Sequence, residues 1–311
     1  MNVFLHIGAH RCATTTFQDY LRQNGDRLSL QGTGFWGPLR TRNGLFSGIL
    51  PKPGVVTGRD KQRRAAGRLQ IQLTRSAGMG TQNLIISDEN MMGSIRANLR
   101  MAELYSGVGE RMARFGHAFG GRVTDVALSI RSLDAYWASA VGFGVARGFP
   151  VPRPATLSRL AASPRSWRDV ITDVACALPE ARIRVLPFET FAGRPDAQLE
   201  ALTAIEPPRS HARGWLNATP RLQDLRALLT PQEAVLLPEG DGRWQPFSDT
   251  EQACLREIYA DDLMWLTGGA DGLAHLVRDP DNKMAGWNPP PKELTRGSRY
   301  DDEERRMAGA G

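Results

Sequence analysis

The sequence predicts an α/β protein in which helices flank a central parallel sheet and form three layers. Short apolar runs alternate with longer segments of helical periodicity from the N-terminus to about residue 187. Each run is separated from the next by enough residues for a crossover helix, which parallel pairing requires. Right-handed crossovers then put helices on both faces of the sheet.

Four segments are predicted strands. Apolar side chains fill most of their positions, as is typical of parallel strands buried on both faces. These strands are residues 3–7, 83–87, 123–130 and 182–187.

The predicted helices lie between the strands and after them. In the first helix, Phe17, Leu21 and Leu28 fall on one face. The segment 30–56 is rich in Gly and Pro and is predicted to be a long loop. Helices are expected at residues 14–27, 59–75, 133–147 and 167–177, within 96–119, and over most of the chain from 188 to about 276 as a helical C-terminal elaboration.

The end of the chain differs in composition from the rest. Residues 288–291 read Asn-Pro-Pro-Pro, which fits neither a helix nor a central strand, and the residues that follow are polar. We therefore expect one α/β domain over residues 1–285 and a flexible C-terminal tail over 286–311.

Composition excludes several classes of protein. Hydrophobic residues make up 41% of the chain and charged residues 23%, which is typical of a globular protein. No apolar run approaches the roughly 18 residues of a membrane span, and the N-terminus lacks the features of a secretory signal. The three cysteines are far apart and suggest no disulfide framework, which favours a cytoplasmic location.

Charge favours an anionic partner without specifying it. The chain has 39 Lys and Arg against 33 Asp and Glu, a net charge of +6. A basic stretch over residues 59–75 has no interleaved aromatic residues, so we expect no nucleic-acid partner. No pair of histidines has metal-ligand spacing, and no metal site is predicted.

The loop after the first strand has the properties of an anion-binding site. The segment Gly8-Ala-His10-Arg11-Cys12-Ala13-Thr14-Thr15-Thr16 follows a strand and opens a helix. Unpaired N–H groups and the helix dipole favour negative charge at such a position. Arg11 adds a full positive charge, the threonine hydroxyls add donors, and His10 is a further candidate donor or base.

The same loop departs from the Walker A pattern of nucleotide phosphotransferases. Gly8 and Thr15 match that pattern, but Ala13 replaces its second glycine and Thr14 its lysine. The lysine that reaches the outer phosphates is therefore missing, and the basic residue stands earlier, at Arg11.

The next two strands also end in polar residues, and parallel strands bring these ends to one edge of the sheet. Asp88 and Glu89 follow the second predicted strand. A carboxylate there is a candidate general base, with Glu89 the first choice and Asp88 the second, although either could simply cap the next helix. Arg131 ends the third strand, and Ser139 lies eight residues later in the following helix.

These motifs together resemble the sulfotransferases that use 3′-phosphoadenosine 5′-phosphosulfate (PAPS), including bacterial sulfotransferase-like proteins with a P-loop-like fold. The stretch from Arg11 to Thr15 is similar to their 5′-phosphosulfate loop, with Arg11 where the family usually has Lys and Ala13 where it usually has Gly. Arg131 and Ser139 have the spacing of the family's 3′-phosphate ligands. Weaker similarities lie at Trp167–Val170, Val185–Glu189, Asn217–Pro220 and Tyr259–Leu263.

The resemblance implies a PAPS-dependent enzyme that transfers a sulfuryl group to a hydroxyl or amine. The acceptor would be a small molecule, a lipid head group or a saccharide. Arg11, Glu89 and His10 would be catalytic, and no metal would be needed. The cofactor ligands would be Arg11, Cys12, Ala13, Thr14, Thr15, Thr16, Arg131 and Ser139. Two alternatives are a divergent P-loop phosphotransferase that needs Mg²⁺ and ATP, and a nucleotide- or glycan-binding protein without catalytic activity.

Overall fold

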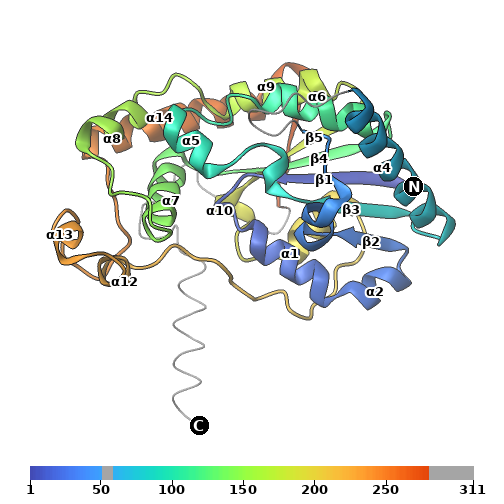
Figure 1. Cartoon of the computed structure of the whole chain (residues 1–311), viewed down its shortest axis with the longest axis horizontal. Coiled ribbons are helices and arrows are strands. Elements are labelled where there is room, and N and C mark those ends of the chain that lie inside the picture. Colours follow the sequence, from blue (N-terminus) through green and yellow to red (C-terminus); the bar gives the residue numbers. More distant parts are fainter. Residues whose placement is uncertain (51–58, 280–311) are drawn as a thin grey trace, which may run out of the picture.

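A computed structural model describes residues 1–50 and 59–279 of the chain. Six parallel strands form one sheet with helices on both faces, as the sequence predicts (Figure 1). The strand order is β2-β3-β1-β4-β5-β6. The strands are β1 (Asn2–Gly8), β2 (Thr33–Trp36), β3 (Asn83–Ser87), β4 (Asp125–Ile130), β5 (Arg182–Pro187) and β6 (His275–Leu276).

The strand order places β1 at a switch point. The chain leaves β1 towards β2 and β3 on one side, and then crosses to β4, β5 and β6 on the other. β1 pairs in parallel with both β3 and β4. In open α/β sheets, ligands bind beyond the carboxyl ends of the strands at such a point. The loops after β1, β3 and β4 meet there.

The two faces of the sheet carry separate apolar cores, because successive side chains of a strand point to opposite sides. In β1, Val3, Leu5 and Ile7 belong to the larger core and Phe4 to the smaller one. The larger core includes residues of α4, α6, α7, α9 and α14, whereas the smaller one includes residues of α1, α2 and α11. Figure 1 shows α4, α6 and α9 above the sheet and α1 and α2 below it.

The helices have the following bounds. Before β4 lie α1 (Thr14–Gln23), α2 (Gly25–Leu30), α3 (Pro38–Arg40), the π-helical turn η1 (Thr41–Leu45), α4 (Arg59–Gly78), the 3-10 turn η2 (Glu89–Met91), α5 (Ile95–Met101) and α6 (Val108–Phe119). After β4 lie α7 (Leu133–Val145), α8 (Pro154–Ala161), α9 (Trp167–Ala177), α10 (Phe188–Phe191), α11 (Pro195–Thr203), α12 (Leu222–Ala227), α13 (Pro231–Ala234), α14 (Asp249–Thr267) and the 3-10 turn η3 (Ala270–Gly272).

The prediction of a long loop over 30–56 was wrong for its first half. Residues 33–45 form β2, α3 and η1, and β2 pairs with β3 over four residues. Such a short strand containing Gly34 lacks the apolar run that marked the other strands. Residues 51–58 lie outside the described part of the chain.

Other segments also differ from the prediction. The helix expected over 14–27 is interrupted at Asn24, whose side chain donates to the carbonyls of Tyr20 and Ser210. A helix expected within 96–119 is present as α6, and the shorter α5 precedes it. β6 was not predicted, and residues 204–221 contain no helix. The expected tail over 286–311, and the domain boundary at 285, fall outside the described residues.

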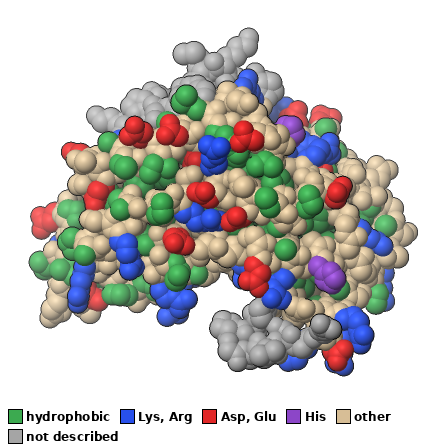
Figure 2. All heavy atoms as spheres, turned by 90° about the horizontal axis from the view of Figure 1, so that it is seen from above, with side chains coloured by type: hydrophobic (Ala, Val, Ile, Leu, Met, Phe, Trp, Pro, Cys, Tyr) green, Lys and Arg blue, Asp and Glu red, His purple; other side chains and the backbone are tan. Residues whose placement is uncertain are grey.

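The face formed by α6, α9 and α14 shows no grouping of charge that would indicate a partner (Figure 2). From the side of α6, α9 and α14, acidic and basic side chains intermingle rather than gathering by sign (Figure 2). Among the described residues, no helix combines the length and apolar character needed to cross a bilayer.

Candidate functional site

The loop after β1 leads into α1 through two residues in the left-handed region. Arg11 has φ 63° and Ala13 has φ 60°. This conformation costs a residue with a Cβ atom about 1 kcal/mol. Ala13 is the N-cap of α1 and provides no side-chain cap, so the first-turn N–H groups of α1 have no capping side chain. Such N–H groups are suited to an anion.

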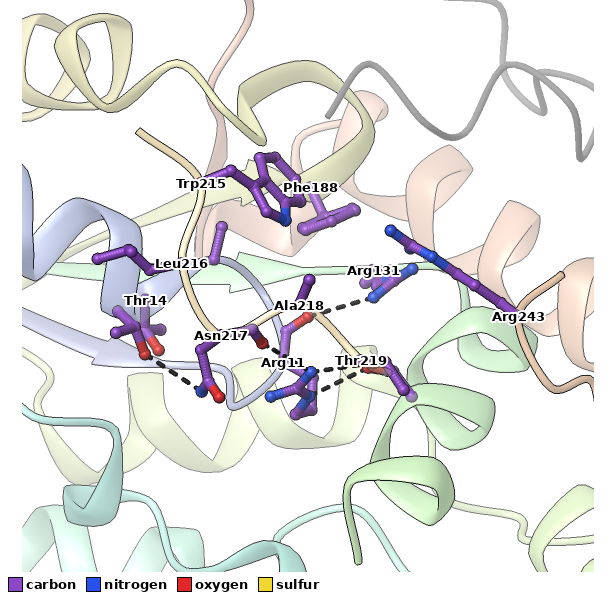
Figure 3. A pocket seen from close by; sticks show the side chains of 13 residues that line it. Arg11, Thr14, Arg131, Phe188, Trp215, Leu216, Asn217, Ala218, Thr219 and Arg243 are labelled. Carbon is purple, nitrogen blue, oxygen red and sulfur yellow. Dashed lines mark hydrogen bonds between the residues drawn. The ribbon is translucent and has the colours of Figure 1, made fainter. Parts of the chain in front are cut away.

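The structure brings most of the predicted ligand residues to one pocket. Residues from the loop, the end of β4, α7 and a distant segment of the chain line it (Figure 3). None of the described residues that line it is acidic. They are Arg11, Ala13, Thr14, Thr15, Arg131, Ser139, Phe188, Trp215, Leu216, Asn217, Ala218, Thr219 and Arg243.

Arg131 is a buried cation with few partners. Its side chain is 7% exposed, and the guanidinium lies 4.2 Å from the centre of the Phe188 ring. One Nη donates to the carbonyl of Arg11 at 3.3 Å, whereas Nε has no hydrogen-bond partner. Within the described chain, no carboxylate lies within ion-pair distance of it, and burial lowers its pKa. A buried guanidinium without a close counter-ion is costly and is suited to an anionic ligand.

Arg11 lies beside Arg131 and adds to the positive charge. Burial and then the nearby Arg131 lower the pKa of Arg11 to about 10. Its Nε donates to Ser139 Oγ at 3.1 Å, and one Nη donates to Thr219 Oγ1 at 3.0 Å. The guanidinium also stacks on the Phe143 ring, 4.5 Å from its centre. Arg11, Arg131 and Ser139, which are far apart in the sequence, therefore meet in one pocket.

Residues 215–219, which we call the strap, cross over the loop. The backbone N–H of Leu216 donates to Thr16 Oγ1 at 3.0 Å, and Asn217 Nδ2 donates to Thr15 Oγ1 at 3.4 Å. The Thr16 hydroxyl is thus engaged by the strap, and Thr16 does not line the pocket.

The other end of the strap is held from α7. Ser139 Oγ and Thr219 Oγ1 are 2.7 Å apart, and Arg11 donates to the carbonyl of Asn217 at 3.0 Å. Beneath the strap the pocket encloses only about 40 Å³. Small-molecule pockets usually measure about 300–1,000 Å³, so this cavity can hold only part of a nucleotide.

The C-terminal segments singled out in the sequence surround Arg131. Trp167 Nε1 donates to the carbonyl of Arg131 at 2.7 Å. Glu189 accepts the N–H of Ser132 at 2.9 Å and the Tyr259 hydroxyl at 2.8 Å. Asp262 in turn accepts N–H groups at the start of α9, at 3.0 and 3.1 Å. Burial raises the pKa of Asp262 to about 6. These segments therefore fix the position of the β4 end.

Glu89 lies outside this pocket, in a second polar cluster after β3. Its carboxylate accepts Gln18 Nε2 at 2.9 Å and Arg42 Nη2 at 2.9 Å. Burial alone would raise the pKa of Glu89, but a protonated His10 ring, a backbone N–H, the Gln18 amide and the positive charge of Arg42 each lower it, and the net effect is a lowered pKa. Glu89 is therefore ionised at neutral pH. Asp88 accepts Thr41 Oγ1 at 2.6 Å and the Arg42 guanidinium at 2.7 Å, which gives it a structural role.

His10 and Cys12 have surroundings that the sequence did not reveal. His10 is buried and contacts the Tyr105 hydroxyl and Asn90. Burial, as the largest of several effects, lowers its pKa. The Cys12 thiol lies in the larger core, and burial raises its pKa to about 12. The backbone N–H of Cys12 donates to the carbonyl of Ala9 at 3.3 Å, and Cys12, although a predicted ligand residue, does not line the pocket. His6, inside β1, hydrogen-bonds Ser87 and is a core residue.

Sequence reasoning missed several pocket residues. Phe188 and Trp215 form an aromatic pair along one wall, with ring centres 6.3 Å apart. Thr219 and Asn217 belong to a segment noted only for its resemblance, and Arg243 was not noted at all. No periodic pattern marks residues 204–221, so their approach to the loop could not be predicted from spacing.

Comparisons with protein-family profiles, curated proteins and solved structures found no match. Within the described residues, no group of three or more His, Cys, Asp or Glu is arranged to hold a metal ion.

We predict that Ala13→Gly stabilises the protein. Glycine adopts φ 60° without the steric cost of a Cβ atom, so the free energy of unfolding should rise by about 1 kcal/mol. Ala113→Gly, at an exposed position inside α6, is the matched control and should lower it by about 1 kcal/mol. Urea unfolding of the three proteins measures both effects. A loss of stability in Ala13→Gly would contradict the strain at Ala13.

We predict that Arg131 contributes more to anion binding than to stability. Arg131→Met retains an apolar chain on Phe188 and removes the charge, so the unfolding free energy without ligand should change little. Arg256→Met should cost on the order of 2 kcal/mol, because it leaves the buried Asp134 carboxylate without its 2.7 Å partner.

Thermal unfolding with and without inorganic pyrophosphate completes this comparison. Pyrophosphate should stabilise the wild type and Arg256→Met but not Arg131→Met. Equal stabilisation of Arg131→Met would show that the anion binds elsewhere.

Proposed function

We propose that this protein is a sulfotransferase that moves a sulfuryl group from PAPS to a hydroxyl or amine. The observation that carries the proposal is the buried, poorly partnered Arg131 guanidinium in one pocket with the loop before α1. PAPS carries a phosphosulfate at one end and a phosphate at the other. A site for it needs several positive charges, and Arg11, Arg131 and Arg243 supply them.

The described residues include the types of hydrogen-bond donor that such a ligand needs. The N–H groups at the start of α1 and the Thr14 and Thr15 hydroxyls are donors for the 5′-phosphosulfate. Arg131 and Ser139 are donors for the 3′-phosphate. Arg11 hydrogen-bonds Ser139, so in this conformation its charge lies on the side that we assign to the 3′-phosphate.

Bound PAPS supplies a sulfuryl group whose bond to the 5′-phosphate oxygen breaks as the acceptor oxygen bonds to sulfur. Glu89 accepts the proton of the attacking hydroxyl, since its carboxylate is ionised and partly exposed. Arg42 and Gln18 orient that carboxylate. The N-terminus of α1 would stabilise the negative charge that develops on the departing phosphate, and Arg11 would do so once its guanidinium turned from Ser139 towards the loop.

The acceptor belongs to a broad class. A hydroxyl of a saccharide, a lipid head group or a small alcohol meets the same requirements. We prefer a saccharide because, in the family that the motifs resemble, some carbohydrate enzymes are thought to use a glutamate as the base and the small-molecule enzymes use a histidine. We also propose a cytoplasmic location, since all three cysteines are free.

Selective binding of adenosine 3′,5′-bisphosphate tests this proposal. We expect the bisphosphate to raise the melting temperature in the absence of Mg²⁺, and Mg-ATP to raise it less, because only the bisphosphate has a 3′-phosphate for Arg131 and Ser139. Ser139→Ala should weaken the effect. Stabilisation by Mg-ATP alone would overturn the proposal in favour of a P-loop phosphotransferase.

Transfer activity provides the second test. With ³⁵S-labelled PAPS and a panel of saccharides, glycolipids and phenols, we expect labelled product from the wild type. Arg11→Ala should abolish transfer with the fold intact, and Glu89→Gln should lower the rate by about 10²-fold or more while bisphosphate binding persists. Near-normal transfer by Arg11→Ala would contradict this mechanism. Bisphosphate binding without transfer to any acceptor would instead identify a non-catalytic binding protein.

A further inference from the structure

A chain of buried hydrogen bonds runs from α5 to the loop before α1. Asn98 Nδ2 donates to the Tyr136 hydroxyl at 2.9 Å, and the Tyr136 hydroxyl lies 3.2 Å from that of Tyr105. The Tyr105 oxygen is in turn 3.0 Å from the backbone nitrogen of His10 and 2.9 Å from its Nδ1. All four residues are buried, so each proton in the chain needs a partner within it.

The direction of donation along these hydrogen bonds is fixed at Asn98. Asn98 Oδ1 accepts the backbone N–H of Tyr105 at 3.2 Å, so its amide nitrogen is the group that faces Tyr136. Tyr136 therefore accepts from Asn98 and donates its own proton to the oxygen of Tyr105. In the opposite direction, the Tyr136 proton would have no acceptor.

Counting protons then shows which atoms donate at the His10 end of this series of hydrogen bonds. The Tyr105 oxygen accepts two hydrogens, one from Tyr136 and one from the backbone of His10, and a hydroxyl accepts no more. Its own proton must then go to His10 Nδ1, which is unprotonated. The remaining ring proton is on Nε2, where it donates to Asn90 Oδ1 at 3.2 Å.

We propose that Tyr105 is a positioning residue that holds His10 as the neutral Nε2–H tautomer, which makes His10 a hydrogen-bond donor and leaves Glu89 as the base. Neither ring nitrogen has a free lone pair, so His10 cannot take a proton from an acceptor. The assignment of the tautomer does not depend on the proposed sulfotransfer. The assignment of Glu89 as the base does rest on that proposed function.

The electrostatic surroundings of His10 agree with a neutral ring. Burial lowers its pKa, and Arg42 acts in the same direction; Glu89, Asn90 and Asp88 oppose them but are outweighed. Arg42 forms ion pairs with both Asp88 and Glu89, which reduces their attraction for a proton on His10.

Nuclear magnetic resonance of protein with ¹⁵N-labelled histidine tests the tautomer without any ligand. We expect the wild-type His10 ring to show the Nε2–H pattern at neutral pH and no titration between about pH 6 and 8. An Nδ1–H tautomer, or an imidazolium in that range, would overturn the proposal. A His10→Gln variant assigns the signals.

Two tyrosine variants separate positioning from simple packing. Tyr105→Phe removes the proton given to Nδ1, so the pKa of His10 should rise towards its ordinary value and the Nδ1 resonance should move. Tyr136→Phe removes the hydroxyl that donates to Tyr105 and frees one acceptor position on the Tyr105 oxygen. The buried Tyr105 proton still has only Nδ1 as its acceptor, so His10 should keep the Nε2–H pattern. Equal spectra for Tyr105→Phe and the wild type would show that Tyr105 does not hold the ring.

A pH profile then tests the functional part. If sulfotransfer occurs, the wild-type rate should be flat from about pH 8 to 6, whereas Tyr105→Phe should gain an inflection in that range. A wild-type inflection assigned to His10 would show that this residue is the base. If no transfer is found, the proposed function fails while the resonance experiment still decides the tautomer.

Discussion

The buried charge of Arg131 is the constraint on which the arrangement of the site depends. The Arg131 guanidinium lies at the end of a central strand and loses its hydration there. The protein replaces only part of that hydration, because one Nη forms a hydrogen bond of 3.3 Å and Nε has no partner. Phe188 stacks on its face, and Glu189 lies near enough to raise its pKa, but the two carboxylate oxygens of Glu189 already accept hydrogen bonds from Ser132 and Tyr259. The pocket therefore keeps a positive charge that its own walls do not neutralise.

Three hydrogen bonds from the later helices hold the end of β4 in place. α9 reaches the carbonyl of Arg131 through Trp167, and α14 fixes both Glu189, through Tyr259, and the start of α9, through Asp262. A single strand end is thus fixed by three separate segments. This explains why short motifs scattered over about a hundred residues of sequence belong to one structural unit.

Prediction from the sequence succeeded where a residue's position follows from the sheet. β1, β3, β4 and β5 were recognisable as apolar runs, and parallel pairing then placed Arg11 and Arg131 at one edge. β2 and β6 are too short to produce such a signal, and pairing with β3 and β5 specifies them instead. Asp88 bonds to Thr41 and Arg42, which both belong to η1. Because η1 lies in a segment that was predicted as loop, this role of Asp88 could not be predicted. The left-handed backbone at Ala13 could not be predicted either, since alanine gives no indication of it.

The strap occupies hydrogen-bonding groups of the site as well as shaping it. Its hydrogen bonds to Thr15, Arg11 and Ser139 use groups that line the pocket, whereas its bond to Thr16 lies outside the pocket. A ligand therefore exchanges bonds with the protein rather than filling an open space. An anion that contacted these groups would therefore have to replace the strap's hydrogen bonds with its own.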